Sequence, residues 1–268
     1  MSKNDPFNVF DWYFTDVSER DGARFHALKA QKAETSVLMD LIRADSLVHY
    51  ALWSELPANH PVGELWLETQ TDLLASVYLA YGGFFRQALC VLRCWFEIAV
   101  HGVYFSGHYG QKNEKYEQWR RGDRRAPAKM EQVAKSLASR NDMVKKADEA
   151  TILRKLKPIY SFLSQQIHAQ GLDIHKLQNG RDNVPRFLSR SYDIWYKETL
   201  EAFDAVCFLY GIFFPNVIAS YLKGSKGELN RTCELMKSLS KALPDFRDLL
   251  NDVFATIKTS RVDMRKKD

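Results

Sequence analysis

Residues 83–104 read GFFRQALCVLRCWFEIAVHGVY. This stretch decides the fold class because, as a helix, it has apolar side chains around nearly its whole circumference. When successive residues are placed 100° apart, as in an α-helix, the polar side chains fall in one strip about 80° wide. The strip consists of Arg86, Cys90, Arg93, Glu97 and His101. A surface helix shows the opposite proportion, with a narrow apolar stripe and a broad polar face. The stretch is therefore predicted to be the central helix of a helical core.

The segments on either side also carry apolar residues at the three-four spacing of helices, and no run alternates with period two. Gly82 and Gly83 separate the central helix from the one before it, and Pro158 is expected to bend or to start a later one. The expected helices cover residues 30–54, 62–81, 83–104, 126–137, 147–170, 190–222 with a kink near Pro215, 228–242 and 245–257. The fold class predicted is all-α.

The composition is that of a globular chain: 268 residues, of which 46% are hydrophobic and 26% charged. Four cysteines lie in apolar helical surroundings, which is typical of free buried thiols in a reducing compartment. They are Cys90, Cys94, Cys207 and Cys233. The first residues lack the pattern of a signal peptide, so a cytoplasmic location is expected.

One stretch approaches the length of a membrane span. Residues 205–222 read AVCFLYGIFFPNVIASYL, close to the 20 or so apolar residues that cross a bilayer. Pro215 and Asn216 interrupt it, however, and the mean hydropathy of the whole chain is −0.36. We therefore expect a buried helix here and no membrane association.

The positive charge is concentrated in one segment. Residues 112–157 contain 14 Lys or Arg against 7 Asp or Glu, a surplus of +7, although the whole chain carries only +5. Such a segment attracts nucleic-acid phosphates, and Trp119 and Tyr116 would be available to stack on an unpaired base. The candidate nucleic-acid-binding residues are Trp119, Arg120, Arg121, Arg124, Arg125 and Lys129. The alternative is a solvated surface that keeps the protein soluble.

The polar strip of the central helix has three interpretations. Arg93 and Glu97 are four residues apart and can pair with each other, with Asp72 as a second partner. Alternatively, Arg93, Glu97 and His101 form a pocket for an anion or a scissile phosphate, with His101 as acid or base. A metal site with cysteines is disfavoured, because His101 lies about 10.5 Å along the axis from Cys94. No metal or cofactor is expected.

Sequence motifs of the common catalytic classes are missing from the chain. It contains no P-loop, no dinucleotide-binding glycine pattern, no H-E-x-x-H and no G-x-S-x-G. It also lacks the E-x-x-H pairs of di-iron bundles. P-loop nucleotide hydrolysis, zinc proteolysis and carboxylate-bridged iron chemistry are therefore disfavoured.

Two stretches carry a family resemblance. Residues 80–97, AYGGFFRQALCVLRCWFE, and residues 160–169, YSFLSQQIHA, resemble the HEPN-like helical domains of bacterial toxin and phage-defence proteins. One helix of those domains carries Arg-x-x-x-Glu, and a later one carries Tyr-x-x-Leu-Ser-x-x-x-His. The resemblance spans about residues 62–222. It implies a bundle of four or five helices, frequently dimeric, that associates with RNA.

The chain departs from the active members of that family. HEPN ribonucleases use an Arg and a His separated by four to six residues, and only Arg20 with His26 and Arg43 with His49 fit this spacing here. Both pairs lie outside the region of resemblance. Metal-independent RNA cleavage therefore requires other residues to meet in space. The catalytic candidates are Arg93, Glu97, His101 and His168.

These observations predict a helical bundle core over residues 61–223, with an aromatic segment and a helix over 1–60 and further helices and a basic tail over 224–268. The expected function is that of a nucleic-acid-associated component of a bacterial phage-defence or toxin-type system, binding RNA rather than DNA and forming a homo-oligomer. One alternative is a dimeric HEPN-type endoribonuclease. Another is a non-catalytic adaptor that binds a partner protein of the same system through the C-terminal helices and residues 7–14, FNVFDWYF, which then dock on the partner rather than on the chain's own bundle.

Overall fold

The structure, a computed structural model, describes residues 32–69, 71–106, 114–123, 129–140, 147–168 and 188–265. Every regular element within these ranges is an α-helix, which confirms the all-α prediction. The helices are α2 (Lys32–Glu55), α3 (Pro61–Thr69), α4 (Asp72–Tyr81), α5 (Phe85–Ser106), α6 (Glu114–Arg120), α7 (Met130–Ala138), α8 (Glu149–His168), α9 (Ser189–Phe213), α10 (Pro215–Gly224), α11 (Lys226–Leu239) and α12 (Pro244–Arg265).

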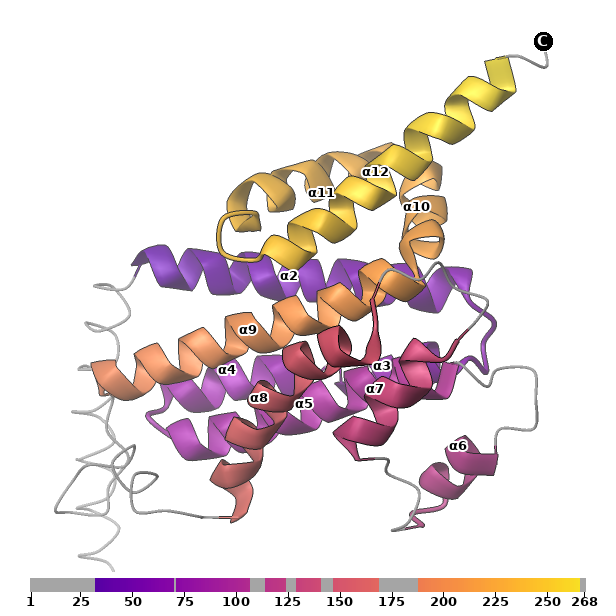
Figure 1. Ribbon diagram of the computed structural model, residues 1–268. Coiled ribbons are helices and arrows are strands. Elements are labelled where there is room, and N and C mark those ends of the chain that lie inside the picture. The colour runs from indigo at the N-terminus through magenta and orange to yellow at the C-terminus, as the bar shows by residue number, and fades with distance from the viewer. Residues whose placement is uncertain are drawn as a thin grey trace, which may run out of the picture.

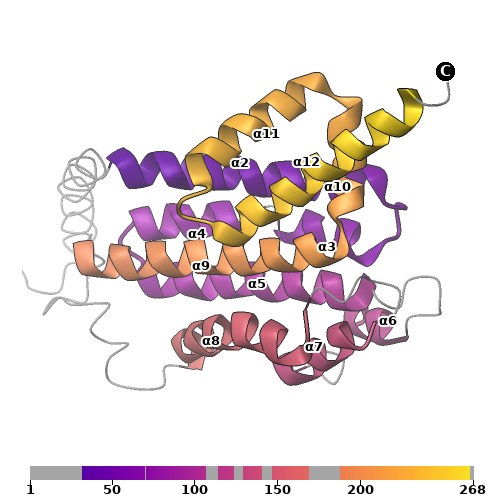
Figure 2. The same ribbon diagram turned by 45° about the horizontal axis from the view of Figure 1, so that its top comes forward.

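Helix α5 is the central helix, as its apolar circumference predicted. It packs against α3, α4, α8 and α9, and its apolar side chains are buried along its length. Figure 2 shows α7 and α8 on one side of the α5–α9 pair, and α2 on the other. Helices α10, α11 and α12 form an outer layer that packs on α2 and α9 (Figure 1).

The apolar stretch 205–222 forms a corner. Helix α9 ends at Phe213, α10 begins at Pro215, and the two axes differ by 89°. Proline is favourable in the first turn of α10, where its missing N–H has no helical partner to lose. Among the described residues, α5 alone is long and apolar enough to span a membrane as one straight helix, and 67% of its most apolar window is buried. That burial is typical of a core helix.

Several helix boundaries differ from the prediction. The segment 62–81, expected to be one helix, divides into α3 and α4 near Thr69 and Thr71. The β-branched threonines disfavour a continuous helix here, and Asp72 favours the start of a new one. Pro158 lies inside α8 and does not start it. Helix α6 was not predicted, and α12 extends eight residues beyond the expected end at Ile257.

The buried apolar residues form one cluster. It includes side chains from α2, such as Leu41, from α5, such as Trp95, and from α12, such as Phe246. The three predicted segments thus contribute to a common core. Residues 7–14 and the end of the basic tail lie outside the described residues.

The four cysteines are free thiols, but they are less buried than predicted. Cys207 is buried, Cys90 and Cys233 are half-buried, and Cys94 is exposed on α5. Cys94 is exposed because it lies on a flank of α5 that the neighbouring helices leave open.

Candidate functional site

The polar strip of α5 faces helix α8. Near the start of α5, the Arg86 Nε donates a hydrogen bond of 3.0 Å to the main-chain oxygen of Gln166. Further along, the Arg93 Nη2 donates to Glu97 Oε1 and to the Tyr160 hydroxyl, each at 3.1 Å. The Arg93 guanidinium also lies 5.1 Å from the centre of the Tyr160 ring, within the range of a cation–π interaction.

The contacts of Arg93 give the strip a structural role. The side chain is 15% exposed, and that of Glu97 is 26% exposed. Desolvating an arginine costs several kcal/mol unless it is paired, and here the carboxylate and the phenol both compensate it. Tyr160, rather than the expected Asp72, is the second partner in these contacts. The geometry is therefore that of internal pairing, which holds α8 against α5.

His101 occupies an apolar environment at the other end of the strip. Its side chain is buried, and Nδ1 lies 2.8 Å from the main-chain oxygen of Glu97. The imidazole stacks on Phe105 and makes an edge contact with Tyr104. The structure thus brings the side chains of Arg93 and Glu97 together. The imidazole of His101, by contrast, contacts the main-chain oxygen of Glu97. His168 ends α8, and its side chain lies outside the described residues.

The seam between α5 and α8 contains polar atoms that the described residues do not satisfy. Arg93 Nε, Ser164 Oγ and Gln166 Oε1 are buried without a hydrogen-bond partner in this part of the chain. No cluster of three or more metal-ligating side chains occurs among the residues described. Burial raises the pKa of the Cys90 thiol, which disfavours the thiolate that a metal would need.

The Arg43 and His49 pair, which fits the HEPN spacing, does not form a joint site. Arg43 is exposed and pairs with Asp40. His49 is buried on a different side of α2, where Nε2 lies 2.7 Å from the Tyr210 hydroxyl and Nδ1 lies 2.9 Å from Asp45 Oδ1. A cavity of about 10 Å³ adjoins His49 and Tyr210, which is room for one water and not for a substrate. The other pair, Arg20 and His26, lies outside the described residues.

The basic segment is only partly available for a ligand. Arg121 and Lys129 are exposed. Arg120 is half exposed, but it pairs with Glu117 at 3.3 Å and approaches Glu64 at 4.0 Å. The two remaining arginines of the predicted set, Arg124 and Arg125, lie outside the described residues.

The aromatic residues of this segment pack inward. Tyr116 is buried, its hydroxyl donates a hydrogen bond to Glu64, and burial raises the pKa of that hydroxyl. Trp119 is half-buried and stacks on Tyr116, with an angle of 10° between the ring planes. Both rings contact Phe105 of α5. The prediction that Tyr116 is available to stack on a base is therefore wrong, because the ring anchors α6 to the core.

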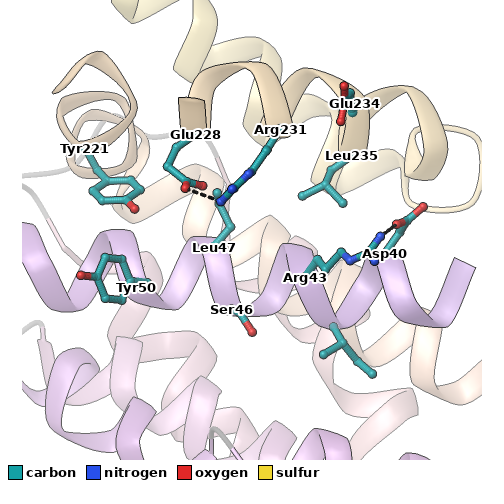
Figure 3. A pocket seen from close by; sticks show the side chains of 11 residues that line it. Asp40, Arg43, Ser46, Leu47, Tyr50, Tyr221, Glu228, Arg231, Glu234 and Leu235 are labelled. Atoms are coloured by element: carbon teal, nitrogen blue, oxygen red, sulfur yellow. Dashed lines mark hydrogen bonds and ion pairs between the residues drawn. The ribbon is translucent and has the colours of Figure 1, made fainter. Parts of the chain in front are cut away.

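A groove that the sequence did not indicate lies between α2 and the α10–α11 layer (Figure 3). Its volume is about 1050 Å³. Leu47 and Leu235 contribute apolar surface to it, and Tyr50 and Tyr221 meet at one end with their ring centres 5.6 Å apart. The only sequence signal is the aromatic residue Tyr50 on the outer face of a helix that already has a full apolar face.

Both arginines of the groove are paired with carboxylates of its walls. On α2, Asp40 Oδ1 accepts from Arg43 at 3.0 Å, and Asp40 Oδ2 accepts from Ser238 of α11 at 2.5 Å. On α11, Arg231 pairs with Glu228 at 2.8 Å. Both arginines are mostly exposed, so the groove presents guanidinium groups to solvent without a strong excess of either charge.

Two carboxyl groups inside the bundle, Glu198 and Asp204, have pKa values that burial raises to about 7, and both should contribute to the response to pH. Glu198 on α9 is 9% exposed, no described residue donates a hydrogen bond to it, and burial raises its pKa to about 7 from 4.5. The unfolded chain loses this proton near pH 4.5, whereas the folded chain keeps it up to about pH 7. The free energy of unfolding should therefore fall as the pH rises from 4.5 to 7 and should stay low above that range.

We expect Glu198→Gln to remove the part of this dependence that Glu198 contributes, and the part that Asp204 contributes to remain. The variant should be about 2 kcal/mol more stable than the native chain at pH 8 and equally stable at pH 4. Thermal unfolding at pH 4, 6 and 8 would measure the difference. Asp193→Asn, at an exposed position of the same helix, is the matched control and should change stability little. A lower melting temperature for Glu198→Gln at pH 8 would show that the native carboxylate is stabilised by its surroundings.

The described surface thus offers two places where a ligand could bind, the cations of α6 and α7 and the groove beside α2. The α5–α8 seam, by contrast, is closed by its own contacts. Comparison with protein-family models, with curated proteins and with solved structures finds no match to this chain.

Proposed function

We propose that this chain is a cytoplasmic, nucleic-acid-associated component of a bacterial phage-defence or toxin-type system, and that it acts by binding rather than by catalysis. The observation that carries the proposal is the exposure of Arg121 and Lys129 within a segment that has a surplus of +7. Exposed cations gain affinity for phosphates by releasing the counterions condensed on a nucleic acid. The HEPN-like resemblance favours RNA over DNA as the ligand.

The contacts of the polar strip argue against catalysis. Arg93 already binds Glu97 and Tyr160, so its charge is not directed at a phosphodiester. His101 is buried between aromatic rings, where it does not reach a substrate in this conformation. A proton-transfer catalyst must lie within hydrogen-bond distance of the reacting group.

The binding proposal is tested by reversing two charges. Arg121→Glu combined with Lys129→Glu should lower the affinity for single-stranded RNA at least about tenfold at 0.1 M salt. The slope of log affinity against log salt concentration should become shallower by about 1.4, because each lost phosphate contact on a single strand accounts for about 0.7. Fluorescence anisotropy with a labelled oligonucleotide over a series of salt concentrations measures both quantities.

The control reverses the same amount of charge elsewhere. Lys223→Glu combined with Lys241→Glu places the change at exposed positions of α10 and after α11. If both double variants lose the same affinity, only net charge matters and the assignment to α6 and α7 is wrong. Cleavage of the RNA by the native chain that disappears in His101→Ala would instead establish the ribonuclease alternative.

The adaptor alternative has its own supporting observation. Met39, Tyr50 and Trp53 expose between 44% and 45% of their surface on α2. Large apolar side chains grouped on a surface are typical of protein–protein contacts. Binding of a partner protein and binding of RNA can coexist, because α2 and the basic helices lie on opposite sides of the bundle (Figure 2).

A further inference from the structure

The outer face of α2 carries an unusual set of side chains. Six large hydrophobic side chains are exposed among the described residues, and three of them belong to this helix. They are Met39, Tyr50 and Trp53. Ser46 and Arg43 are exposed between them, and the Arg43 side chain is 67% exposed. The helix therefore offers one continuous face to solvent beside the groove of Figure 3.

The spacing of these residues is that of a helix–helix contact. Met39, Ser46 and Trp53 are seven residues apart, and so are Arg43 and Tyr50. A repeat of seven keeps residues on the same side of a helix, as in a coiled coil. The face from Met39 to Trp53 is about 21 Å long at 1.5 Å per residue. It can therefore accommodate a helix of four turns.

The same face is complementary to itself. In an antiparallel pair of helices centred on Ser46, Met39 of one copy lies opposite Trp53 of the other, because each is seven residues from the centre. Arg43 lies opposite Tyr50, at three and four residues from the centre. A thioether on an indole and a guanidinium on a phenol ring are both favourable contacts. The small side chain of Ser46 lets the two backbones approach at the crossing point.

The charges beside the helix also suit a second copy. Figure 3 shows Arg43 toward one end of the groove, and Tyr50, Tyr221 and Glu228 toward the other. An antiparallel second α2 carries its own Arg43 to the end where the two tyrosines and the Glu228 carboxylate lie. Each copy then supplies a cation to the two tyrosines of the other, beside a Glu228 carboxylate that also pairs with Arg231. Because a two-fold axis relates the copies, each such contact occurs twice in the dimer.

We propose that two copies of this chain form a symmetric dimer through α2, with the two-fold axis passing beside Ser46. The dimer needs nothing from the proposed nucleic-acid binding, and the two are tested separately. Figure 2 shows α2 and α8 on opposite sides of the bundle. The dimer therefore keeps the Arg93 groups of the two copies far apart, and it does not assemble a shared catalytic centre from the α5–α8 seams.

Charge at residue 46 tests the geometry, because the proposal places this residue opposite itself. The native chain should sediment with twice the mass of 31.0 kDa. Ser46→Lys alone and Ser46→Glu alone should each weaken the dimer at least about 100-fold, since like charges then meet at the axis. An equimolar mixture of the two should recover a dimer that contains one copy of each. Sedimentation velocity over a concentration series, with one variant labelled, measures all three.

The matched controls are Ser161→Lys and Ser161→Glu, at an exposed serine of α8 on the other side of the molecule. These should leave the dimer intact, and circular dichroism should show that all four variants are folded. A native chain that is monomeric throughout the series overturns the proposal. So does a dimer that survives in both residue-46 variants, because it must use another surface. A mixture that stays monomeric overturns the self-facing arrangement.

Discussion

Replacing His49 by leucine is expected to lower the free energy of unfolding by about 3–5 kcal/mol. The imidazole joins two helices from within the core: Nδ1 lies 3.0 Å from the main-chain oxygen of Asp45 and 2.9 Å from its Oδ1, and Nε2 lies 2.7 Å from the hydroxyl of Tyr210 on α9. Both partners are buried, with exposed fractions of 4% for Asp45 and 2% for Tyr210. Leucine fills a similar volume, but it gives the Tyr210 hydroxyl no hydrogen-bond partner and leaves the buried Asp45 carboxylate without the adjacent imidazole.

The loss of stability in His49→Leu should be much larger than the loss caused by removing one contacting group without leaving its partner unsatisfied. Tyr210→Phe removes only one hydroxyl and should cost about 1 kcal/mol, because the ring and its packing remain. Asp45→Asn combined with His49→Leu removes the stranded carboxylate and should recover part of the loss. Urea unfolding followed by circular dichroism measures each variant, and the double-mutant cycle gives the coupling between the two positions. A loss below 1 kcal/mol for His49→Leu would mean that water satisfies Asp45 in the variant.

Trp195→Ala should have an effect of comparable size, about 3–5 kcal/mol, for a different reason. The Trp195 side chain is fully buried on α9, and its loss leaves a large cavity beside Tyr192 and Tyr81. Trp195 is also the first donor in a chain of hydrogen bonds that links three helices. The indole Nε1 donates to Ser76 Oγ of α4 at 2.9 Å, and that hydroxyl donates to the main-chain oxygen of Ala88 on α5 at 2.8 Å.

Two further variants separate the volume of Trp195 from its hydrogen bond. Trp195→Phe keeps most of the apolar volume and loses the donor, so it should cost about 1–2 kcal/mol. Ser76→Ala removes the hydroxyl and leaves the indole N–H buried without its acceptor, with a similar cost. Chemical unfolding of the three variants provides the comparison. Equal losses for Trp195→Ala and Trp195→Phe would show that the surrounding helices close the cavity.

The sequence predicted the fold class and the central helix because both depend on local periodicity. The apolar circumference of residues 83–104 indicated burial, and α5 is buried between four helices. The break at residues 82 and 83 was also predictable, since Gly83 adopts a φ of 75° that favours glycine. The all-α fold, the position of α5 and the corner at Pro215 follow from such signals.

The details of the candidate site were less predictable because they depend on distant residues. That Arg93 pairs with Glu97 follows from a spacing of four, but Tyr160 is 67 positions away and no local pattern shows it. Tyr116 lies in a basic segment and was expected to be exposed for binding. Its ring is instead buried, where the hydroxyl bonds Glu64 and the ring contacts Phe105. The groove combines Asp40 with Ser238, 198 positions apart. Only the packed structure brings such pairs together.

The right angle between α9 and α10 bears on how the molecule comes apart. Pro215 has no amide hydrogen with which to extend the hydrogen-bond ladder of α9, and this favours the change of direction after Phe213. The chain that forms α10, α11 and α12 therefore starts at a right angle to the axis of α9. When the contacts of these three helices with α2 and α9 break, the helices should separate from the bundle together, as one cooperative unit. The amide protons of α10, α11 and α12 should therefore exchange before those of α5.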